Sequence, residues 1–246
     1  MNNNLFVTKR NGEKEPIDLE KIHRVIAWAA ENLDQVSVSQ VELKSHIQFY
    51  DGIKTADIHE TIIKAAADLI SEDTPDYQYL AARLAVFHLR KKAYGQFEPP
   101  SLYKHVVNMV ESGRYDQHLL VDYDESDFEH MALFLDHSRD LNFSYAAVKQ
   151  LEGKYLVQNR VNGEIYESAQ FLYILVAACL FAKYPKSTRL SYVEGFYNAI
   201  STFKISLPTP IMAGVRTPTR QFSSCVLIEC DDSLDSINAA SSAIVK

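Results

Sequence analysis

The first apolar positions of the chain lie in two short segments, residues 5–10 and 13–17, on either side of Asn11-Gly12. Asparagine followed by glycine is the dipeptide that best tolerates the two positive φ angles of a tight hairpin turn. The pattern therefore predicts a β-hairpin here, and Asp18 directly after it is placed to cap a helix.

After the hairpin, apolar residues recur at the three- and four-residue spacing of amphipathic helices. Ser39 with Glu42 gives a capping-box signature for the second helix, and Thr55 is placed to cap the third. Three of the predicted helices show a clear apolar stripe, made up in turn of Ile22, Val25, Ile26 and Ala29; of Ile58, Ile62, Ala65 and Leu69; and of Leu80, Leu84 and Phe87. The first third of the chain is therefore expected to fold as a hairpin with a four-helix bundle.

Gly95 and Pro99-Pro100 interrupt this helical pattern, which indicates a self-contained domain of residues 1–95. Residues 96–220 then form a second region with mainly helical spacing. Its predicted helices cover residues 102–110, 125–135, 145–151, 169–183 and 188–202, and its predicted second hairpin turns at Asn162-Gly163.

The last part of the chain, residues 221–246, combines a short apolar run with a helical pattern. Pro208 and Pro210 are expected to force the preceding segment into extended structure. Residues 225–228 then read as a short buried strand, and a helix follows from residue 234. A strand, a turn and a helix are how an α/β barrel begins, so the predicted fold is mainly α with small β-hairpins (α+β), leading into an incomplete barrel. The final helix has no glycine cap or polar tail, which suggests a piece of something longer.

Composition and charge limit the functional classes. The chain has 246 residues, of which 47% are hydrophobic, and this supplies ample material for a core. Its net charge of -7 and pI near 5.6 argue against a general affinity for nucleic acid or anionic membranes. The N-terminus does not resemble a secretory signal, and the most apolar run, residues 171–182, is too short to span a bilayer. A cytoplasmic protein is expected.

The chain contains three cysteines, Cys179, Cys225 and Cys230. An odd number without regular spacing fits neither a disulfide scaffold nor a paired metal-binding motif. No metal site is expected, and this cysteine usage fits a reducing compartment.

Basic side chains occur on several elements of the first domain, although the domain is slightly acidic overall. They are Lys9, Arg10, Lys21, Arg24, His59, Lys64, Arg90, Lys91 and Lys92. A triphosphate needs cationic donors from different elements, and Val7, Ile17 and Ile22 are apolar side chains that could sandwich a base nearby. On the pattern alone, solvated helix faces and a packing role for His59 are the commoner explanations. The sequence has neither a phosphate-binding P-loop nor a dinucleotide fingerprint, so the common nucleotide folds are excluded.

The region around the predicted hairpin resembles an ATP-cone domain. The resemblance is carried by VTKRNG at residues 7–12, EPIDLEKI at residues 15–22 and DGIKT at residues 51–55. It implies that the hairpin and first helix bind ATP or dATP, with Mg²⁺, as allosteric effectors: ATP would activate and dATP would inhibit. The positions that the resemblance implicates as nucleotide contacts are Lys9, Arg10, Glu15, Pro16, Ile17, Asp18, Leu19, Glu20, Lys21, Thr55, His59 and Lys91.

A second stretch resembles the first catalytic segment of ribonucleotide reductase large subunits. It reads ISLPTPIM at residues 205–212 and RTPTRQFSSCVL at residues 216–227. Together with the cone, the resemblance covers essentially the whole chain and points to the aerobic class Ia type, whose catalytic domain is a ten-stranded α/β barrel. It implies that the catalytic residue is Cys225, that the substrate is bound by Thr209 and Ser224, and that an allosteric specificity site includes Asp232, Ser233 and Leu234.

Each of these assignments has a plainer alternative. Cys225 could be a small buried side chain in a strand, and Thr209 and Ser224 could be turn or strand residues. Asp232 or Ser233 could merely cap the last helix. A capping role and a role in the specificity site are compatible, because the free N–H groups at a helix start also attract anions.

By the same resemblance, Cys225 would be half of a dithiol that reduces the ribose 2′ carbon. Cys230 lies five residues away, which is about 16 Å along an extended strand, whereas a disulfide needs Cα atoms within about 7 Å. Cys179 lies in an apolar helical run and reads as a core thiol. The partner of Cys225 is therefore expected beyond residue 246.

The resemblance implies an enzyme that reduces ribonucleoside diphosphates to deoxyribonucleoside diphosphates by a radical mechanism. Its implied partners are a small di-iron radical subunit, thioredoxin or glutaredoxin, and a second copy in a homodimer, and no tightly bound cofactor is implied in this subunit. The chain alone is expected to bind nucleotide without turnover. An alternative is a non-catalytic nucleotide-sensing assembly module. A cone-bearing transcriptional regulator would need a cysteine-rich zinc ribbon and a basic face, and the sequence has neither.

Overall fold

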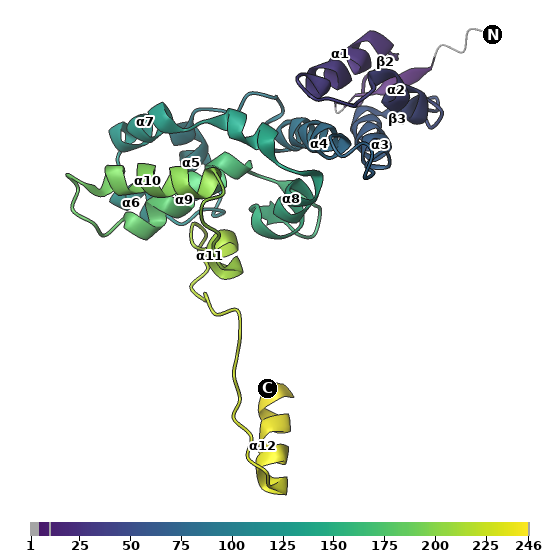
Figure 1. Cartoon of the computed structure of the whole chain (residues 1–246). Coiled ribbons are helices and arrows are strands. Elements are labelled where there is room, and N and C mark those ends of the chain that lie inside the picture. The colour runs from purple at the N-terminus through teal and green to yellow at the C-terminus, as the bar shows by residue number, and fades with distance from the viewer. Residues whose placement is uncertain (1–4, 10, 246) are drawn as a thin grey trace.

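The first part of the protein combines a small sheet with four helices (Figure 1). The computed structural model describes residues 5–9 and 11–245. Strand β1 (Phe6–Thr8) pairs antiparallel with β2 (Lys14–Pro16), which confirms the first hairpin. Strand β1 also pairs in parallel with β3 (Ile53–Lys54), so the strand order is β2-β1-β3. The sequence did not predict β3, because two residues are too few to show a strand periodicity.

The four helices are α1 (Leu19–Ala30), α2 (Val38–His46), α3 (Thr55–Ala67) and α4 (Tyr77–Tyr94). Asp18 caps α1 as predicted, because its carboxylate accepts a hydrogen bond from the Lys21 amide at 3.2 Å. The other two predicted caps are wrong. Ser37 rather than Ser39 caps α2, and α3 begins at Thr55 itself with no side-chain cap.

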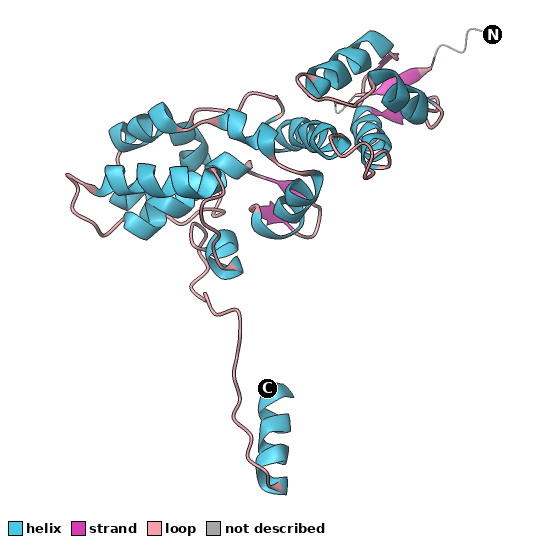
Figure 2. Ribbon diagram, in the orientation of Figure 1, coloured by secondary structure: helices cyan, strands magenta, loops and turns pink. Residues whose placement is uncertain are grey.

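A largely helical body follows, and Figure 2 shows how few strands it contains. The mainly helical fold class with small sheets is thus confirmed. Its elements are α5 (Leu102–Glu111), α6 (His118–Asp122), α7 (Glu125–Phe134), the 3-10 helix η1 (His137–Asn142), α8 (Tyr145–Gln150), the π-helix η2 (Leu151–Tyr155), β4 (Gln158–Asn159), β5 (Glu164–Ile165), α9 (Ala169–Phe181), α10 (Arg189–Ser201), α11 (Thr209–Gly214) and α12 (Leu234–Val245). Strands β4 and β5 form the predicted second hairpin, and α9 is the buried centre of this body. Within the described part of the chain, no helix is long and apolar enough to cross a membrane.

The segment with Pro208 and Pro210 is helical rather than extended, so that prediction is wrong. Pro208 occupies the N-cap of α11, and Pro210 lies in its first turn. Proline is tolerated there, because the first N–H groups of a helix have no partner within the helix and the fixed φ of proline suits a helix start.

The predicted strand at residues 225–228 is not formed. Residues 221–231 have no regular structure, Val226 and Leu227 are exposed, and α12 has no buried residue. Figure 1 shows this segment leading away from the helical body. A strand must pair its backbone N–H and C=O groups with a neighbour, and none of the described residues supplies one.

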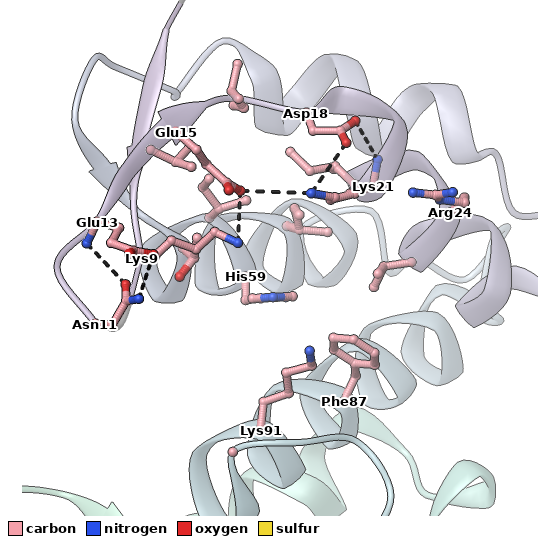
Figure 3. A pocket seen from close by; sticks show the side chains of 18 residues that line it. Lys9, Asn11, Glu13, Glu15, Asp18, Lys21, Arg24, His59, Phe87 and Lys91 are labelled. Carbon is pink, nitrogen blue, oxygen red and sulfur yellow. Dashed lines mark hydrogen bonds and ion pairs between the residues drawn. The ribbon is translucent and has the colours of Figure 1, made fainter.

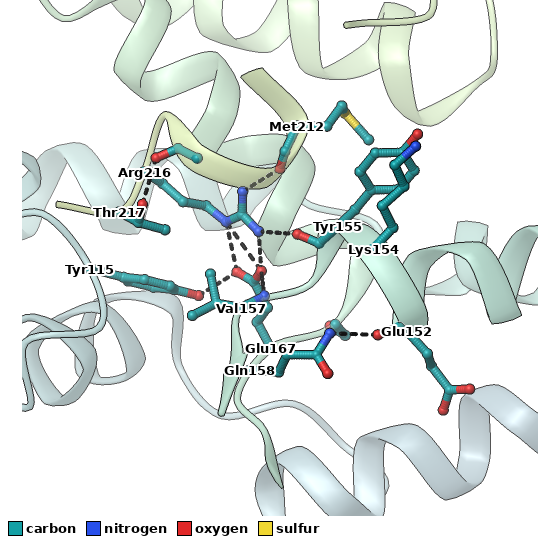
Figure 4. A network of polar contacts seen from close by, with 12 residues as sticks. Tyr115, Glu152, Lys154, Tyr155, Val157, Gln158, Glu167, Met212, Arg216 and Thr217 are labelled. Carbon is teal, nitrogen blue, oxygen red and sulfur yellow. Dashed lines mark hydrogen bonds and ion pairs between the residues drawn. The ribbon is translucent and has the colours of Figure 1, made fainter. Parts of the chain in front are cut away.

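A buried polar network connects the segment after α11 to the rest of the helical body (Figure 4). Arg216 and Glu167 are both fully buried and form an ion pair. The Arg216 guanidinium also donates to the Met212 carbonyl at 2.6 Å and to the Tyr155 carbonyl at 2.9 Å. The Glu167 carboxylate accepts from the Tyr115 hydroxyl at 2.6 Å. Every charged group in this network therefore has partners, as burial requires.

His105 lies beside this network, and we expect its burial to make the stability of the protein depend on pH. Its side chain is buried, and its Nε2 lies 3.2 Å from the Tyr115 hydroxyl. Desolvation lowers the pKa of His105 from 6.5 to about 4, against the opposing charge of Glu167. Because the folded state favours the neutral imidazole, the stabilisation is present above pH 6.5 and is lost as the pH falls towards 4, by about 1.4 kcal/mol per pH unit. An NMR titration that placed the imidazole pKa near 6.5 would contradict this.

Candidate nucleotide site

A cavity of about 680 Å³ lies in the first part of the chain, between the hairpin with α1 and the helices α3 and α4 (Figure 3). It draws side chains from several elements that are distant in sequence. The lining residues are Val7, Lys9, Asn11, Glu13, Glu15, Ile17, Asp18, Lys21, Ile22, Arg24, Val25, Thr55, Ile58, His59, Ile62, Phe87, Lys91 and Gly95. The volume lies within the range of small-molecule sites.

The apolar part of the wall includes the three side chains that the sequence suggested for contact with a base. Val7 on β1 is 3% exposed and Ile22 on α1 is 8% exposed. Ile17, which precedes α1, is partly buried against the core. All three line the cavity. Their position follows from local structure, because strand alternation turns Val7 inward and the Asp18 cap begins the helix that carries Ile22.

Carboxylates hold two of the cationic side chains at the mouth of the cavity. The Lys9 ammonium lies 2.9 Å from the Glu15 carboxylate across the hairpin. The Lys21 ammonium lies 3.6 Å from the Asp18 carboxylate and 3.9 Å from that of Glu15. Arg24 follows on the same face of α1, since residues three apart on a helix are neighbours. These side chains thus form a charged rim beside an apolar wall.

Helix α4 supplies the opposite wall of the cavity. Figure 3 shows Lys91 and Phe87 facing the hairpin from α4. The Lys91 ammonium lies 5.2 Å from the centre of the Phe87 ring, which is a cation–π distance. The His59 ring lies 5.5 Å from both Phe87 and His88. His59 therefore has the packing role expected of it and also lines the cavity.

The structure brings most of the predicted nucleotide contacts together. Lys9, Glu15, Ile17, Asp18, Lys21, Thr55, His59 and Lys91 all line the cavity. Pro16, Leu19 and Glu20 do not, because they belong to the outward-facing residues of β2 and the first turn of α1. Arg10 lies outside the described residues.

The sequence pattern does not identify several of the lining residues. The pattern assigns Asn11 only to the predicted turn, Glu13 only to the second strand segment of the hairpin, and Phe87 only to the core. Arg24 was noticed as a basic residue but not assigned to the site, although its i+3 spacing from Lys21 is a usable signal. Of the other basic residues, Arg90 is buried in an ion pair with Asp140 at 2.8 Å, and Lys92 pairs with Glu60 at 3.5 Å.

The residues suggested for catalysis do not meet in an enclosed site. Thr209 is the first residue of α11, whereas Ser224 and Cys225 lie on the exposed segment after it. The Ser224 hydroxyl lies 3.8 Å from the Cys225 sulfur. These three residues line neither the cavity of about 680 Å³ nor a second cavity of about 290 Å³ beside α6 and α9. Asp232, Ser233 and Leu234 lead into α12, where the Ser233 hydroxyl caps the helix through the Ser236 amide at 3.2 Å.

No group of three or more potential metal ligands occurs among residues 5–9 and 11–245. The carboxylates that line the cavity, from Glu13, Glu15 and Asp18, are of the oxygen type that Mg²⁺ prefers. Magnesium commonly binds through a few carboxylates together with nucleotide phosphates rather than in an all-protein cage.

Comparison with known families places both parts of the chain. Residues 5–92 match the ATP cone domain, and residues 141–220 match the all-alpha domain of ribonucleotide reductase. Over all 246 residues the chain is 80% identical to ribonucleoside-diphosphate reductase 1 subunit alpha of Escherichia coli and 76% identical to ribonucleoside-diphosphate reductase subunit alpha of Haemophilus influenzae. Every residue of this chain therefore aligns with a ribonucleoside-diphosphate reductase alpha subunit. A phage T4 alpha subunit is 48% identical over 242 residues, which are 98% of this chain.

The chain spans 32% of the length of each of these alpha subunits. Within it, the ATP cone match ends at residue 92, just before Gly95 terminates α4 in a left-handed conformation with φ of 73°. The reductase all-alpha match begins at residue 141 within η1 and ends at residue 220, after Arg216. All residues that line the cavity, except Gly95, therefore lie within the ATP cone match.

Proposed function

We propose that residues 1–95 bind ATP and dATP, with Mg²⁺, as allosteric effectors. The observation that carries the proposal is the cavity itself, in which four cationic side chains converge on an apolar wall. The match to the ATP cone domain supports the choice of nucleotide. ATP is the proposed activator and dATP the proposed inhibitor of the whole enzyme.

The bound geometry follows from the distribution of charge. The base packs against Val7, Ile17 and Ile22, and the phosphates face the ammonium groups of Lys9 and Lys21. Phosphate oxygens replace the carboxylates that now hold these lysines, because a triphosphate carries more negative charge than a single carboxylate. Lys91 on α4 and Arg24 on α1 complete the cationic lining of the site. The contact set of the resemblance, including Arg10, Pro16, Leu19, Glu20, Thr55 and His59, belongs to this proposal.

For the whole protein, we propose the large subunit of a class Ia ribonucleoside-diphosphate reductase. It reduces ribonucleoside diphosphates with a radical from a small di-iron subunit and electrons from thioredoxin or glutaredoxin, and it works as a homodimer. Cys225 is one thiol of its reducing pair, Thr209 and Ser224 bind substrate, and residues 232–234 belong to the specificity site. Residues 96–220 are the helical region of this subunit and residues 221–246 the beginning of its barrel.

Calorimetric titration of ATP and dATP into the chain tests the nucleotide proposal. The wild type should bind both in a saturable manner. Replacing Lys9 or Lys91 by alanine should weaken binding roughly 10- to 100-fold, because each removes a charge-assisted contact of about 1.5–3 kcal/mol.

Two matched controls lie on the same elements. Lys14 is exposed on β2 and Lys92 lies beside Lys91 on α4, and neither lines the cavity. The dATP affinities of Lys14→Ala and Lys92→Ala should therefore stay within about threefold of the wild type, because a solvent-exposed charge outside the site contributes little. Equal losses in the controls and in the lining variants would show only a nonspecific charge effect.

The chain also suits a second function, that of a non-catalytic nucleotide-sensing assembly module. Its cavity is assembled from residues 7–95 alone, whereas Cys225 is exposed on an unpaired segment. In this case the chain binds dATP, contacts the small subunit in a dATP-dependent way and shows no turnover. Pull-down of the small subunit with and without dATP distinguishes this module from a passive nucleotide binder.

A further inference from the structure

One arginine of α4 joins the cone to the helical body. The Arg83 guanidinium donates through Nη1 to the Ala29 carbonyl at 3.1 Å and to the Glu31 carbonyl at 2.6 Å. Its Nε donates to the Leu141 carbonyl in η1 at 3.3 Å. A single side chain therefore holds the C-terminal end of α1 against a segment 110 positions further along the chain, counted from Glu31 to Leu141.

The receiving segment, η1, is itself tied firmly to the body. Arg90, two turns after Arg83 on α4, donates to the His137 carbonyl at 2.5 Å and to the Asp140 carboxylate at 2.8 Å. The second oxygen of Asp140 accepts from Gln170 of α9 at 2.9 Å. Short contacts, two of them buried, thus connect η1 to α4 and to the central helix α9.

The other end of α1 lies at the nucleotide cavity. Asp18, Lys21, Ile22 and Val25 line the cavity from the cap and the first seven residues of the helix, and Ala29 lies one turn further on. A 12-residue helix is about 18 Å long and moves nearly as a rigid rod. Displacing its cavity end therefore displaces the carbonyls that Arg83 holds.

We propose that Arg83 transmits effector binding in the cone cavity to η1 and thereby to the reductase all-alpha domain. The inference rests on the proposed nucleotide function and adds a route for its regulation. Arg83 is a positioning residue: it touches backbone carbonyls of both parts and does not line the cavity. Two effectors that seat α1 differently would set η1 differently, since only differential contacts shift a conformational equilibrium.

The planar guanidinium is suited to this task. Its fixed fork of donors reaches three carbonyls at once, whereas a lysine ammonium offers one compact point of charge. Arg83→Lys is therefore expected to keep the positive charge but lose the simultaneous hydrogen bonds to the Ala29 and Leu141 carbonyls.

Hydrogen–deuterium exchange of the whole chain with and without dATP tests the proposal. In the wild type, saturating dATP should change the exchange of amides in residues 137–142 by roughly threefold or more, although no cavity residue lies there. Wild-type chain that binds dATP but shows no change in this segment overturns the inference. Wild-type chain that binds no dATP at all overturns the proposed function instead.

The variants separate transmission from simple stabilisation. Arg83→Gln and Arg83→Lys should bind dATP within about fivefold of the wild type but lose the dATP-dependent change in residues 137–142. The matched control Lys92→Gln should keep this change, because Lys92 lies on the same helix but its ammonium pairs with Glu60 of α3. If Arg83→Gln does not fold, Arg83→Lys and the wild-type measurement decide. A dATP-dependent change that persists in either folded Arg83 variant overturns the inference.

Discussion

Replacing Cys225 by serine in the full-length subunit should abolish nucleotide reduction while leaving effector binding intact. In the proposed reaction, the Cys225 sulfur gives up electrons and ends in a disulfide, a step that a serine oxygen cannot perform. Turnover of a ribonucleoside diphosphate should fall by at least about a thousandfold, which corresponds to about 4 kcal/mol of barrier. The assay combines the variant with the small radical subunit and a dithiol reductant, and calorimetry reports dATP binding separately.

The other two cysteines of the chain are natural controls. Cys230 is exposed on the same segment, and Cys179 is partly buried on α9. Desolvation raises the pKa of the Cys179 thiol to about 12, so it stays protonated and unreactive at neutral pH. Cys179→Ser and Cys230→Ser should therefore retain turnover. Loss of turnover in Cys230→Ser equal to that in Cys225→Ser would contradict the assignment of Cys225 alone.

Replacing Arg216 by alanine should destabilise the helical body by about 3–5 kcal/mol, because it leaves the buried Glu167 carboxylate without its cation. Desolvation opposes the charged form of Arg216, but Glu167 more than offsets it, and the pKa of Arg216 is raised. Truncation also frees the Met212 and Tyr155 carbonyls. Urea denaturation followed by circular dichroism measures the loss.

Arg220 provides the comparison for this prediction. It lies four residues further along and pairs with Asp116, but its side chain is 59% exposed. Asp116 is buried, but its carboxylate keeps the hydrogen bond from the His118 amide at 2.9 Å, and water can replace the exposed Arg220 guanidinium. Arg220→Ala should therefore change the free energy of unfolding by about 1 kcal/mol or less. Equal effects of the two substitutions would show that burial of the Arg216 pair is not what stabilises this region.

Local signals in the sequence predicted much of the fold. The Asn11-Gly12 turn, the Asp18 cap and the Gly95 stop are each set by neighbouring residues, and the structure has all three. The sequence predicts the cavity only in part. The apolar character of Val7 and Ile17 indicates their place in its wall, but only the resemblance to an ATP cone assigns the lysines to it. Pattern alone could not separate lining lysines from solvated ones.

Features that depend on distant partners were not predictable. Strand β3 exists because residues 53–54 lie beside β1, and the ion pair of Arg216 with Glu167 joins positions 49 apart. The segment 225–228 fails to form a strand for the same reason, since its pairing partner is not among the described residues. The prediction of extended structure around Pro210 is wrong because proline fits both an extended segment and the first turn of a helix.

A crystal structure of the chain grown with dATP and Mg²⁺ tests most directly whether the cone cavity is the effector site. We expect the base against Val7 and Ile17, and phosphate oxygens about 3 Å from the ammonium groups of Lys9, Lys21 or Lys91. Ordered dATP bound at another face, with the Lys9–Glu15 ion pair intact across an unfilled cavity, would contradict the assignment.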